Sequence, residues 1–259
     1  MFFFKEPMSS WQAPLFIAGT GGSGTRVFTL LARDLGYFMG NNVNDAHDAM
    51  DMAAFNEAWR VRMLPGQPPL TPGELKKRDS GLEKALRSHR KGIPGPGALW
   101  GYKHPRDIFL LPFLVEKFPA LKFLHVVRDG LDMAFSDNQL QLRDFGPAWL
   151  TADEQQLPVP VRSALLWNRI NTTAADLGEG KLGANYLWMR FEDLCLTPEP
   201  GLARLEAFTG RSFGDARAAA LGRVQPPSSL KRGQRQEPEI TQAVAAACAP
   251  GRRRFGYAA

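Results

Sequence analysis

A glycine-rich segment near the N-terminus constrains the fold of this chain more than any other feature of its sequence. Residues 19–26 read Gly-Thr-Gly-Gly-Ser-Gly-Thr-Arg and follow the short apolar run 14–18, which is typical of a buried parallel strand. The apolar residues that come next recur at helical spacing through Leu35. A strand, a glycine-rich turn and a helix form an anion cradle, because the backbone N–H groups of the turn and of the helix N-terminus can surround a phosphate. We therefore expect a nucleotide-like ligand at this turn.

The spacing of Gly19 and Gly24 is that of a Walker P-loop, but the next residues are Thr25 and Arg26 instead of Lys followed by Ser or Thr. A kinase or ATPase of the P-loop class uses that lysine on the terminal phosphates and that hydroxyl on Mg²⁺. A P-loop-type kinase, or another nucleotide-binding protein, is therefore the alternative function. A tight glycine-rich turn without a ligand is the structural alternative.

Composition sets the class of protein. The chain has 259 residues and is 44% hydrophobic, which fits one large soluble α/β domain over residues 1–259. Its net charge of +6 favours anionic ligands. A nucleic-acid-binding module is a further alternative on charge alone, but the sequence lacks the interleaved aromatic and basic residues of a single-strand binder. The two cysteines, Cys195 and Cys248, indicate neither a disulfide framework nor a metal site.

Targeting signals are weak in this sequence. No stretch approaches the length of a membrane span, and the apolar residues 2–4 are too short for the core of a signal peptide. We therefore expect a cytoplasmic protein without a membrane span.

Apolar runs and helical patterns alternate along the chain, which predicts helices packed around a central parallel sheet. Strands are expected over residues 122–127 and 186–191, and a long helix over residues 161–177. A last helix should begin at Pro238 and run through Ala247.

The segment of about residues 62–98 differs from its surroundings. It is bounded by proline and glycine and contains a basic helical stretch. This pattern predicts a lid or substrate-side insertion, with a solvated surface helix as the alternative.

A second anion site is predicted at Arg128. This residue follows the predicted strand 122–127, at the edge where parallel sheets bind ligands, and Ser136 lies eight residues further on, about two turns into the expected next helix. A guanidinium can hold a phosphate in two places and a hydroxyl can donate a third hydrogen bond. Two anion sites at strand ends indicate a nucleoside with phosphates at both ends.

With both motifs in place, the sequence resembles the sulfotransferases that use 3′-phosphoadenosine 5′-phosphosulfate (PAPS). In that family the first loop wraps the 5′-phosphosulfate, and the arginine and serine of the second motif hold the 3′-phosphate. The resemblance implies a P-loop-like α/β fold, PAPS as donor, 3′-phosphoadenosine 5′-phosphate (PAP) as product, and no metal. Three further stretches look alike: residues 103–106 (Lys-His-Pro-Arg), 190–194 (Arg-Phe-Glu-Asp-Leu) and 255–257 (Phe-Gly-Tyr).

The resemblance also assigns residues to the cofactor. The family carries a lysine or arginine where this chain has Gly22, and Arg26 is the candidate that replaces its charge. A late basic loop of the family is similar to residues 231–233, with the order of the basic residues reversed. The complete set is Gly21, Gly22, Ser23, Gly24, Thr25, Arg26, Arg128, Ser136, Lys231 and Arg232.

Sulfuryl transfer needs cationic groups for the leaving phosphate and a base for the acceptor. By resemblance Lys103 stabilises the leaving phosphate, although a surface lysine before a helix is the structural alternative. Asp48 is the preferred candidate base. The other candidates are His104, Asp45, His47 and Glu57, and helix capping or surface solvation is the alternative role of each. We expect a hydroxyl or amine acceptor from a small molecule, a carbohydrate or a lipid, and no nucleic-acid partner.

Overall fold

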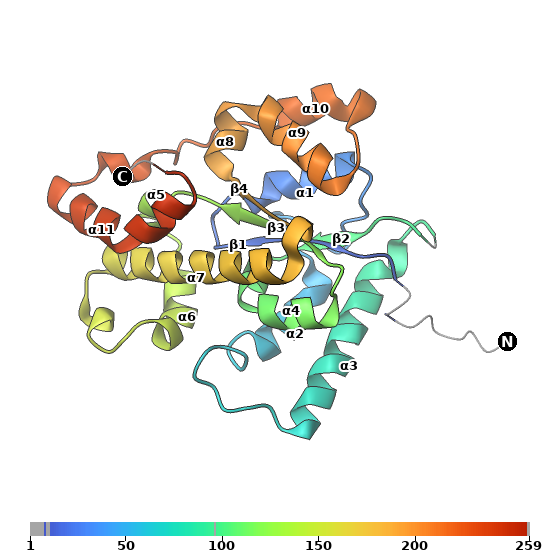
Figure 1. Cartoon of the computed structure of the whole chain (residues 1–259), viewed down its shortest axis with the longest axis horizontal. Helices are drawn as coiled ribbons and strands as arrows, with labels where there is room; N and C mark the ends of the chain where they lie inside the picture. Colours follow the sequence, from blue (N-terminus) through green and yellow to red (C-terminus); the bar gives the residue numbers. More distant parts are fainter. Residues whose placement is uncertain (1–7, 9–10, 96, 258–259) are drawn as a thin grey trace.

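The protein is built on a parallel sheet of four strands, in the order β2-β1-β3-β4. The computed structural model describes residue 8, residues 11–95 and residues 97–257 (Figure 1). The predicted α/β class with a central parallel sheet is confirmed. The strands are β1 (Leu15–Gly19), β2 (Gly101–Lys103), β3 (Lys122–Val127) and β4 (Tyr186–Arg190).

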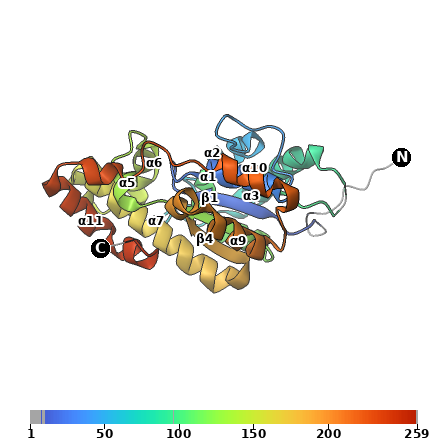
Figure 2. The same cartoon turned by 90° about the horizontal axis from the view of Figure 1, so that it is seen from above.

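Helices cover both faces of this sheet (Figures 1 and 2). The α-helices of the described residues are α1 (Thr25–Asp34), α2 (Ala53–Trp59), α3 (Pro72–His89), α4 (Leu111–Lys117), α5 (Gly130–Ala134), α6 (Leu140–Trp149), α7 (Val159–Leu182), α8 (Phe191–Leu196), α9 (Pro198–Thr209), α10 (Arg217–Arg223) and α11 (Pro238–Arg254).

Strand β1 is apolar and buried along its whole length, because both faces of the sheet are covered there. In β1, Phe16 and Ala18 join a core cluster that includes residues of α3 and α7, while Leu15 and Ile17 join a second cluster with α1, α9 and α10. The sheet is therefore the middle layer of three.

The strand order places two loops side by side. Strand β1 lies between β2 and β3, and Gly19 at the end of β1 is in register with Val126 near the end of β3. After β1 the chain forms β2 on one side of it and then β3 on the other side. Such a reversal of strand order opens a ligand-binding crevice at the carboxyl ends of the strands. The glycine-rich turn and Arg128 both follow these ends.

Two helices extend further than the sequence predicted. Helix α7 spans Val159–Leu182 and α11 runs to Arg254, past Pro250. The last turn of α11 is held by tertiary contacts, since the Gly251 N–H donates to Asn168 Oδ1 at 2.6 Å. A contact between residues so far apart in the sequence cannot be predicted from the periodicity of the helix.

The segment of residues 62–98 contributes helix α3, which begins with a capping box. Thr71 accepts a hydrogen bond from the Glu74 N–H, and the Glu74 carboxylate accepts one from the Thr71 N–H. One side of the helix enters the core, where Leu82 and Leu86 are fully buried. Among the described residues, no helix has the length and apolar character that a membrane span needs.

Burial of α3 leads to a prediction about stability. Leu82→Ala should lower the free energy of unfolding by about 2–5 kcal/mol, because it leaves a cavity in the core. Leu75→Ala on the same helix is the control, since Leu75 is 39% exposed and its loss should cost about 0.5 kcal/mol or less. Urea unfolding measures both. Equal, small losses would show that α3 is dispensable to the core.

Candidate active site

The glycine-rich turn adopts a backbone that only glycine accommodates easily. Gly22 and Gly24 have φ angles of +91° and +89°. A Cβ atom on Gly24 would lie 2.2 Å from the ring of Phe191, and one on Gly19 would lie 2.3 Å from the carbonyl oxygen of Val126. The turn is thus fixed against β3 and α8 by close packing.

This turn presents hydrogen-bond donors that have no protein partner. The hydroxyls of Thr20 and Ser23 are buried, and neither makes a hydrogen bond. Helix α1 starts directly after Gly24 without a side-chain cap or an acidic residue in its first turn. Buried polar groups are normally satisfied, so the orphaned donors at a helix N-terminus indicate an anionic ligand.

Arg128 lies beside the turn, as the sequence predicted. It is 4% exposed and donates to the carbonyl oxygens of Gly22 (3.3 Å) and Ser229 (2.7 Å). Its Nη2 is 3.5 Å from Asp132, and the indole N–H of Trp167 donates to its backbone carbonyl at 3.0 Å. Its Nε is buried and makes no hydrogen bond, which leaves donor capacity for a ligand.

The late basic loop closes over Arg128. Asp132 accepts the backbone N–H groups of Lys231 (2.7 Å) and Gly233 (3.0 Å) and so ties this loop to α5. Nε of Arg232 is buried without a hydrogen bond. Burial, followed by the nearby Arg128 charge, lowers the pKa of Arg232. Two arginines that repel each other in a partly buried place form a second cluster of positive charge, which an anion would neutralise.

The predicted position of Ser136 is wrong. Helix α5 ends at Ala134, so Ser136 lies in the following turn and not two turns into a helix. Its hydroxyl accepts the N–H of Asn138 at 3.3 Å, and its carbonyl accepts Nε2 of Gln139 at 2.6 Å. Such local bonds favour a turn over a helix. A cofactor role for Ser136 stays a prediction.

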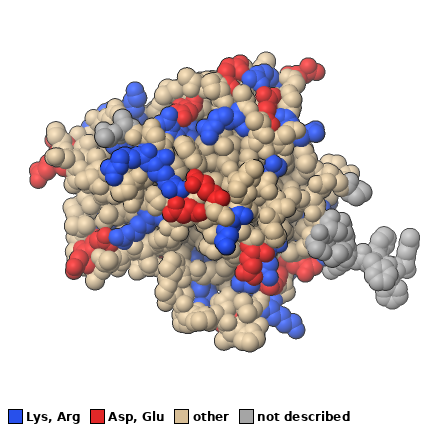
Figure 3. Space-filling view, viewed as in Figure 1, with Lys and Arg blue, Asp and Glu red and all other residues tan. Residues whose placement is uncertain are grey.

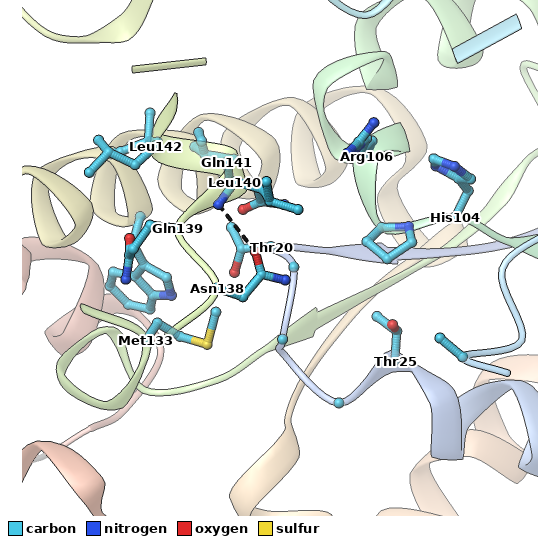
Figure 4. Close-up of a pocket in the computed structure, with 18 of the residues that line it drawn as sticks. Thr20, Thr25, His104, Arg106, Met133, Asn138, Gln139, Leu140, Gln141 and Leu142 are labelled. Carbon is cyan, nitrogen blue, oxygen red and sulfur yellow. Dashed lines mark hydrogen bonds between the residues drawn. The ribbon is translucent and has the colours of Figure 1, made fainter. Parts of the chain in front are cut away.

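The turn opens into a cavity of about 470 Å³ that also contains the three predicted catalytic residues, Lys103, Asp48 and His104. Figure 4 shows the turn between Thr20 and Thr25 running between residues 138–142 on one side and His104 and Arg106 on the other. Trp167, which the sequence assigns to the core or to a substrate wall, is part of the wall. Sequence reasoning missed the rest of it, which is made by Met133, Asn138, Gln139, Leu140, Gln141, Leu142, Ser163, Leu166 and Ile170.

Lys103 is a buried cation paired with Asp48. Its Nζ donates to Asp48 Oδ1 and, at 2.5 Å, to the carbonyl oxygen of Ala46, and the residue is 1% exposed. Burial lowers the pKa of Lys103, and the pairing with Asp48 opposes this in part. Burial alone would raise the pKa of Asp48, but hydrogen bonds from Lys103 and Asn44 lower it overall. The structural alternative of a surface lysine is therefore excluded.

His104 follows β2 and lines the same cavity while only 9% exposed. Burial lowers its pKa to about 4, and the Asp48 charge opposes this shift in part. The imidazole is thus neutral at neutral pH, as a proton acceptor must be.

The end of α11 also carries a structural ion pair. The Nε atom of Arg252 donates to Asp129 Oδ1 at 3.0 Å, and the residue is 8% exposed.

Charged groups are interspersed on the face shown in Figure 3, where Lys and Arg side chains alternate with Asp and Glu side chains. The excess of positive charge is not gathered into one stripe on that face.

Residues 14–215 match the sequence profile of the Sulfotransferase family. Because this match covers most of the 259 residues, the chain belongs to the sulfotransferase family. The prediction of a sulfotransferase from the two anion motifs is confirmed. A search of curated proteins gave no significant match.

Solved structures share the fold at low sequence identity. A sulfotransferase from Alicyclobacillus acidocaldarius is 17% identical, with a TM-score of 0.55 over 96% of this chain and 97% of that one. The sulfotransferase domain of the Synechococcus PCC 7002 olefin synthase is 15% identical, with a TM-score of 0.57 over 100% of both chains. The sulfotransferase STF9 from Mycobacterium avium is 11% identical, with a TM-score of 0.54 over 95% of this chain and 78% of that one.

The role of Asp132 gives a prediction. Asp132→Asn should speed amide hydrogen exchange at Lys231 and Gly233, because one carboxylate acceptor and its charge are lost. Asp137→Asn is the control: Asp137 is exposed and lies within electrostatic range of Arg232, so it removes a similar charge without removing these bonds. Exchange rates that are unchanged in Asp132→Asn would show that the loop is held by other contacts.

Proposed function

We propose that this chain transfers the sulfuryl group of PAPS to the hydroxyl or amine of a small acceptor. The observation that carries the proposal is the pair of anion sites at the ends of β1 and β3, each with buried donors that lack a partner. The residues present fit a nucleoside with a 5′-phosphosulfate and a 3′-phosphate. Bound there, PAPS supplies an activated sulfuryl group with a phosphate as its leaving group.

The two ends of PAPS would be held by different residues. The turn of residues 20–26 and the N-terminus of α1 would hold the phosphosulfate, with Arg26 supplying the charge that Gly22 does not. Arg26 lies close enough to Lys103 to lower its pKa, so both cations act on the same part of the cavity. Arg128, Arg232 and Lys231 would hold the 3′-phosphate, with Ser136 a further donor in this proposal.

Charge develops on the leaving oxygen during transfer, and Lys103 is placed to stabilise it. The Lys103 ammonium donates one hydrogen bond to the Asp48 carboxylate and a second to the backbone carbonyl of Ala46. The third N–H of the ammonium is left for the leaving group. Preorganised donors of this kind stabilise the transition state without reorganising during the reaction.

His104 is our choice of base, over Asp48. Asp48 is engaged by Lys103 and its pKa is lowered, so it is a weak proton acceptor. His104 is neutral and lines the cavity. The apolar wall from α6 and α7 favours an acceptor with an apolar body and one reactive hydroxyl or amine, such as a small molecule or a lipid, and a carbohydrate with an apolar face remains compatible.

A nucleotide panel tests the proposed cofactor. PAP at a hundredfold excess over its Kd should stabilise the protein by about 2.7 kcal/mol, and AMP at the same concentration should stabilise it much less, because it lacks the 3′-phosphate. Arg128→Ala and Arg232→Ala should each reduce this difference, and Ser136→Ala should reduce it less, since a single neutral hydroxyl bond is weaker. Thermal unfolding measures each shift. Equal stabilisation by PAP, AMP and Mg²⁺-ATP would contradict the proposal and favour another nucleotide-binding function.

Kinetics test the role of Lys103. Lys103→Met should lower kcat about 10²–10³-fold and change the KM for PAPS only a few-fold, because the charge it stabilises develops in the transition state. Release of inorganic sulfate from PAPS measures both parameters with water as acceptor. Lys122→Met is the control, since Lys122 is the first residue of β3, at the end of the strand away from the glycine-rich turn, and donates to the carbonyl of Phe208. A raised KM with unchanged kcat would assign Lys103 to ground-state binding.

A further inference from the structure

A buried carboxyl group lies behind His104, on the side away from the cavity. Asp107 is 1% exposed and does not line the cavity. Its Oδ1 lies 3.7 Å from Nδ1 of His104, and its backbone N–H donates to the His104 carbonyl at 3.0 Å. Both residues belong to one turn, at the start of the 3-10 helix Pro105–Phe109. The turn therefore fixes the carboxyl relative to the imidazole.

The Asp107 carboxyl has three neighbouring polar groups, the His104 imidazole, the Tyr102 hydroxyl and the Asn56 amide. Nδ1 of His104 and both carboxyl oxygens of Asp107 are buried, and none makes a hydrogen bond of ordinary geometry. At 3.7 Å the two groups are within reach of each other after a small side-chain rotation. Since Nδ1 is buried, the exposed edge of the imidazole is the one that faces the cavity.

Burial favours the uncharged forms of both side chains, and the neighbouring groups modify this effect. Burial raises the pKa of Asp107 to about 7; Tyr102 and Asn56 oppose this and Asp48 adds to it. Burial lowers the pKa of His104 to about 4. The Asp48 charge opposes that shift, and the remaining charged groups that face His104 are Arg106, Lys103 and Arg60.

We propose that Asp107 is a positioning residue that sets the tautomer of His104 and thereby makes its cavity-facing nitrogen a base. When Asp107 is ionised, its carboxylate accepts a hydrogen bond from the N–H at Nδ1. The other ring nitrogen, Nε2, then carries a lone pair toward the cavity. When Asp107 is protonated, the carboxylic acid donates to Nδ1 and Nε2 carries the proton instead. Only the first form can accept a proton from a substrate. The base role rests on the proposed sulfuryl transfer, whereas the tautomer does not.

The proton balance of the step is complete within the pair. As the acceptor oxygen bonds to sulfur, its proton moves to Nε2 of His104, and the bond from sulfur to the leaving phosphate oxygen breaks. The imidazolium formed is stabilised by the Asp107 carboxylate. Release of the Nε2 proton to water restores the pair.

Asp107 thus explains how a histidine of low pKa can serve as base. A carboxylate behind the imidazole offsets the cost of charging it in a buried place. Asp48 is a poorer partner for this purpose, because its carboxylate is bound to Lys103. The arrangement makes a testable statement about the free protein, with no ligand bound.

The test is nitrogen NMR on protein that carries ¹⁵N-labelled histidine. The chain has four histidines in all. Long-range proton–nitrogen spectra distinguish the two tautomers of each ring, and His104→Gln assigns the His104 signals. We expect the His104 proton to move from Nε2 to Nδ1 as pH rises through about 7. In Asp107→Asn this change should be absent.

His89 supplies a matched control within the same spectra. Its Nδ1 lies 3.9 Å from Asp51, but its Nε2 bonds to the carbonyl of Gly101 at 2.9 Å, which fixes the proton on Nε2. Its tautomer should not change between pH 6 and 8. Asp51→Asn should leave the His104 titration unchanged, and a native His89 signal in Asp107→Asn shows that the variant is folded.

Activity gives the second measurement. Sulfate release from PAPS should rise with pH through about 7 in the wild type, and Asp107→Asn should lose this limb and at least tenfold of kcat while keeping its KM for PAPS. A wild-type His104 tautomer that does not change with pH would overturn the inference, and this result does not depend on whether Asp107→Asn folds. A tautomer that switches in a protein that neither prefers PAP over AMP nor releases sulfate from PAPS would support the positioning role and contradict the proposed function.

Discussion

The close approach of β1 and β3 is the constraint on which the site depends. A Cβ atom on Gly19 would lie 2.3 Å from the Val126 carbonyl oxygen, so only glycine allows the two strands to end side by side. This contact brings the glycine-rich turn next to Arg128, which donates to the carbonyl of Gly22. The glycine-rich turn, which lines the cavity, and Arg128, about a hundred residues later in the sequence, thus lie side by side.

Most charges in this site are matched by the protein, and the unmatched ones mark where ligand is expected. Lys103 is balanced by Asp48, and Arg128 has Asp132 at 3.5 Å. The buried Nε atoms of Arg128 and Arg232 and the hydroxyls of Thr20 and Ser23 are left without hydrogen bonds. Leaving such donors buried costs stability, which a bound anion recovers. The fold therefore maintains a preorganised site at the expense of its own stability.

The sequence predicted what is encoded locally. Strand β3 was predicted at its observed bounds of Lys122–Val127, because a run of apolar residues buried on both faces has a clear pattern. The glycine-rich turn and Arg128 were predicted for the same reason: each follows such a strand. The end of α5 was missed, since the side chain of Ser136 bonds to the backbone of its own turn and so replaces the helix.

Features created by tertiary contact could not be predicted. The wall of the cavity comes from α6 and α7, and α6 contains Gly146 and Pro147, which weaken its helical pattern. Asp107 follows the motif of residues 103–106 with no signal of its own. Its importance arises only because the turn buries it behind His104.

The central claim is that the two anion sites bind the two ends of one nucleotide. Phosphorus NMR of the PAP complex tests it most directly, because a phosphate held by arginines loses its second proton at a lower pH than the usual value of about 6. We predict that the 3′- and the 5′-phosphate signals of bound PAP both stop titrating near pH 6. A bound complex in which the 3′-phosphate titrates as it does in free PAP would contradict this account.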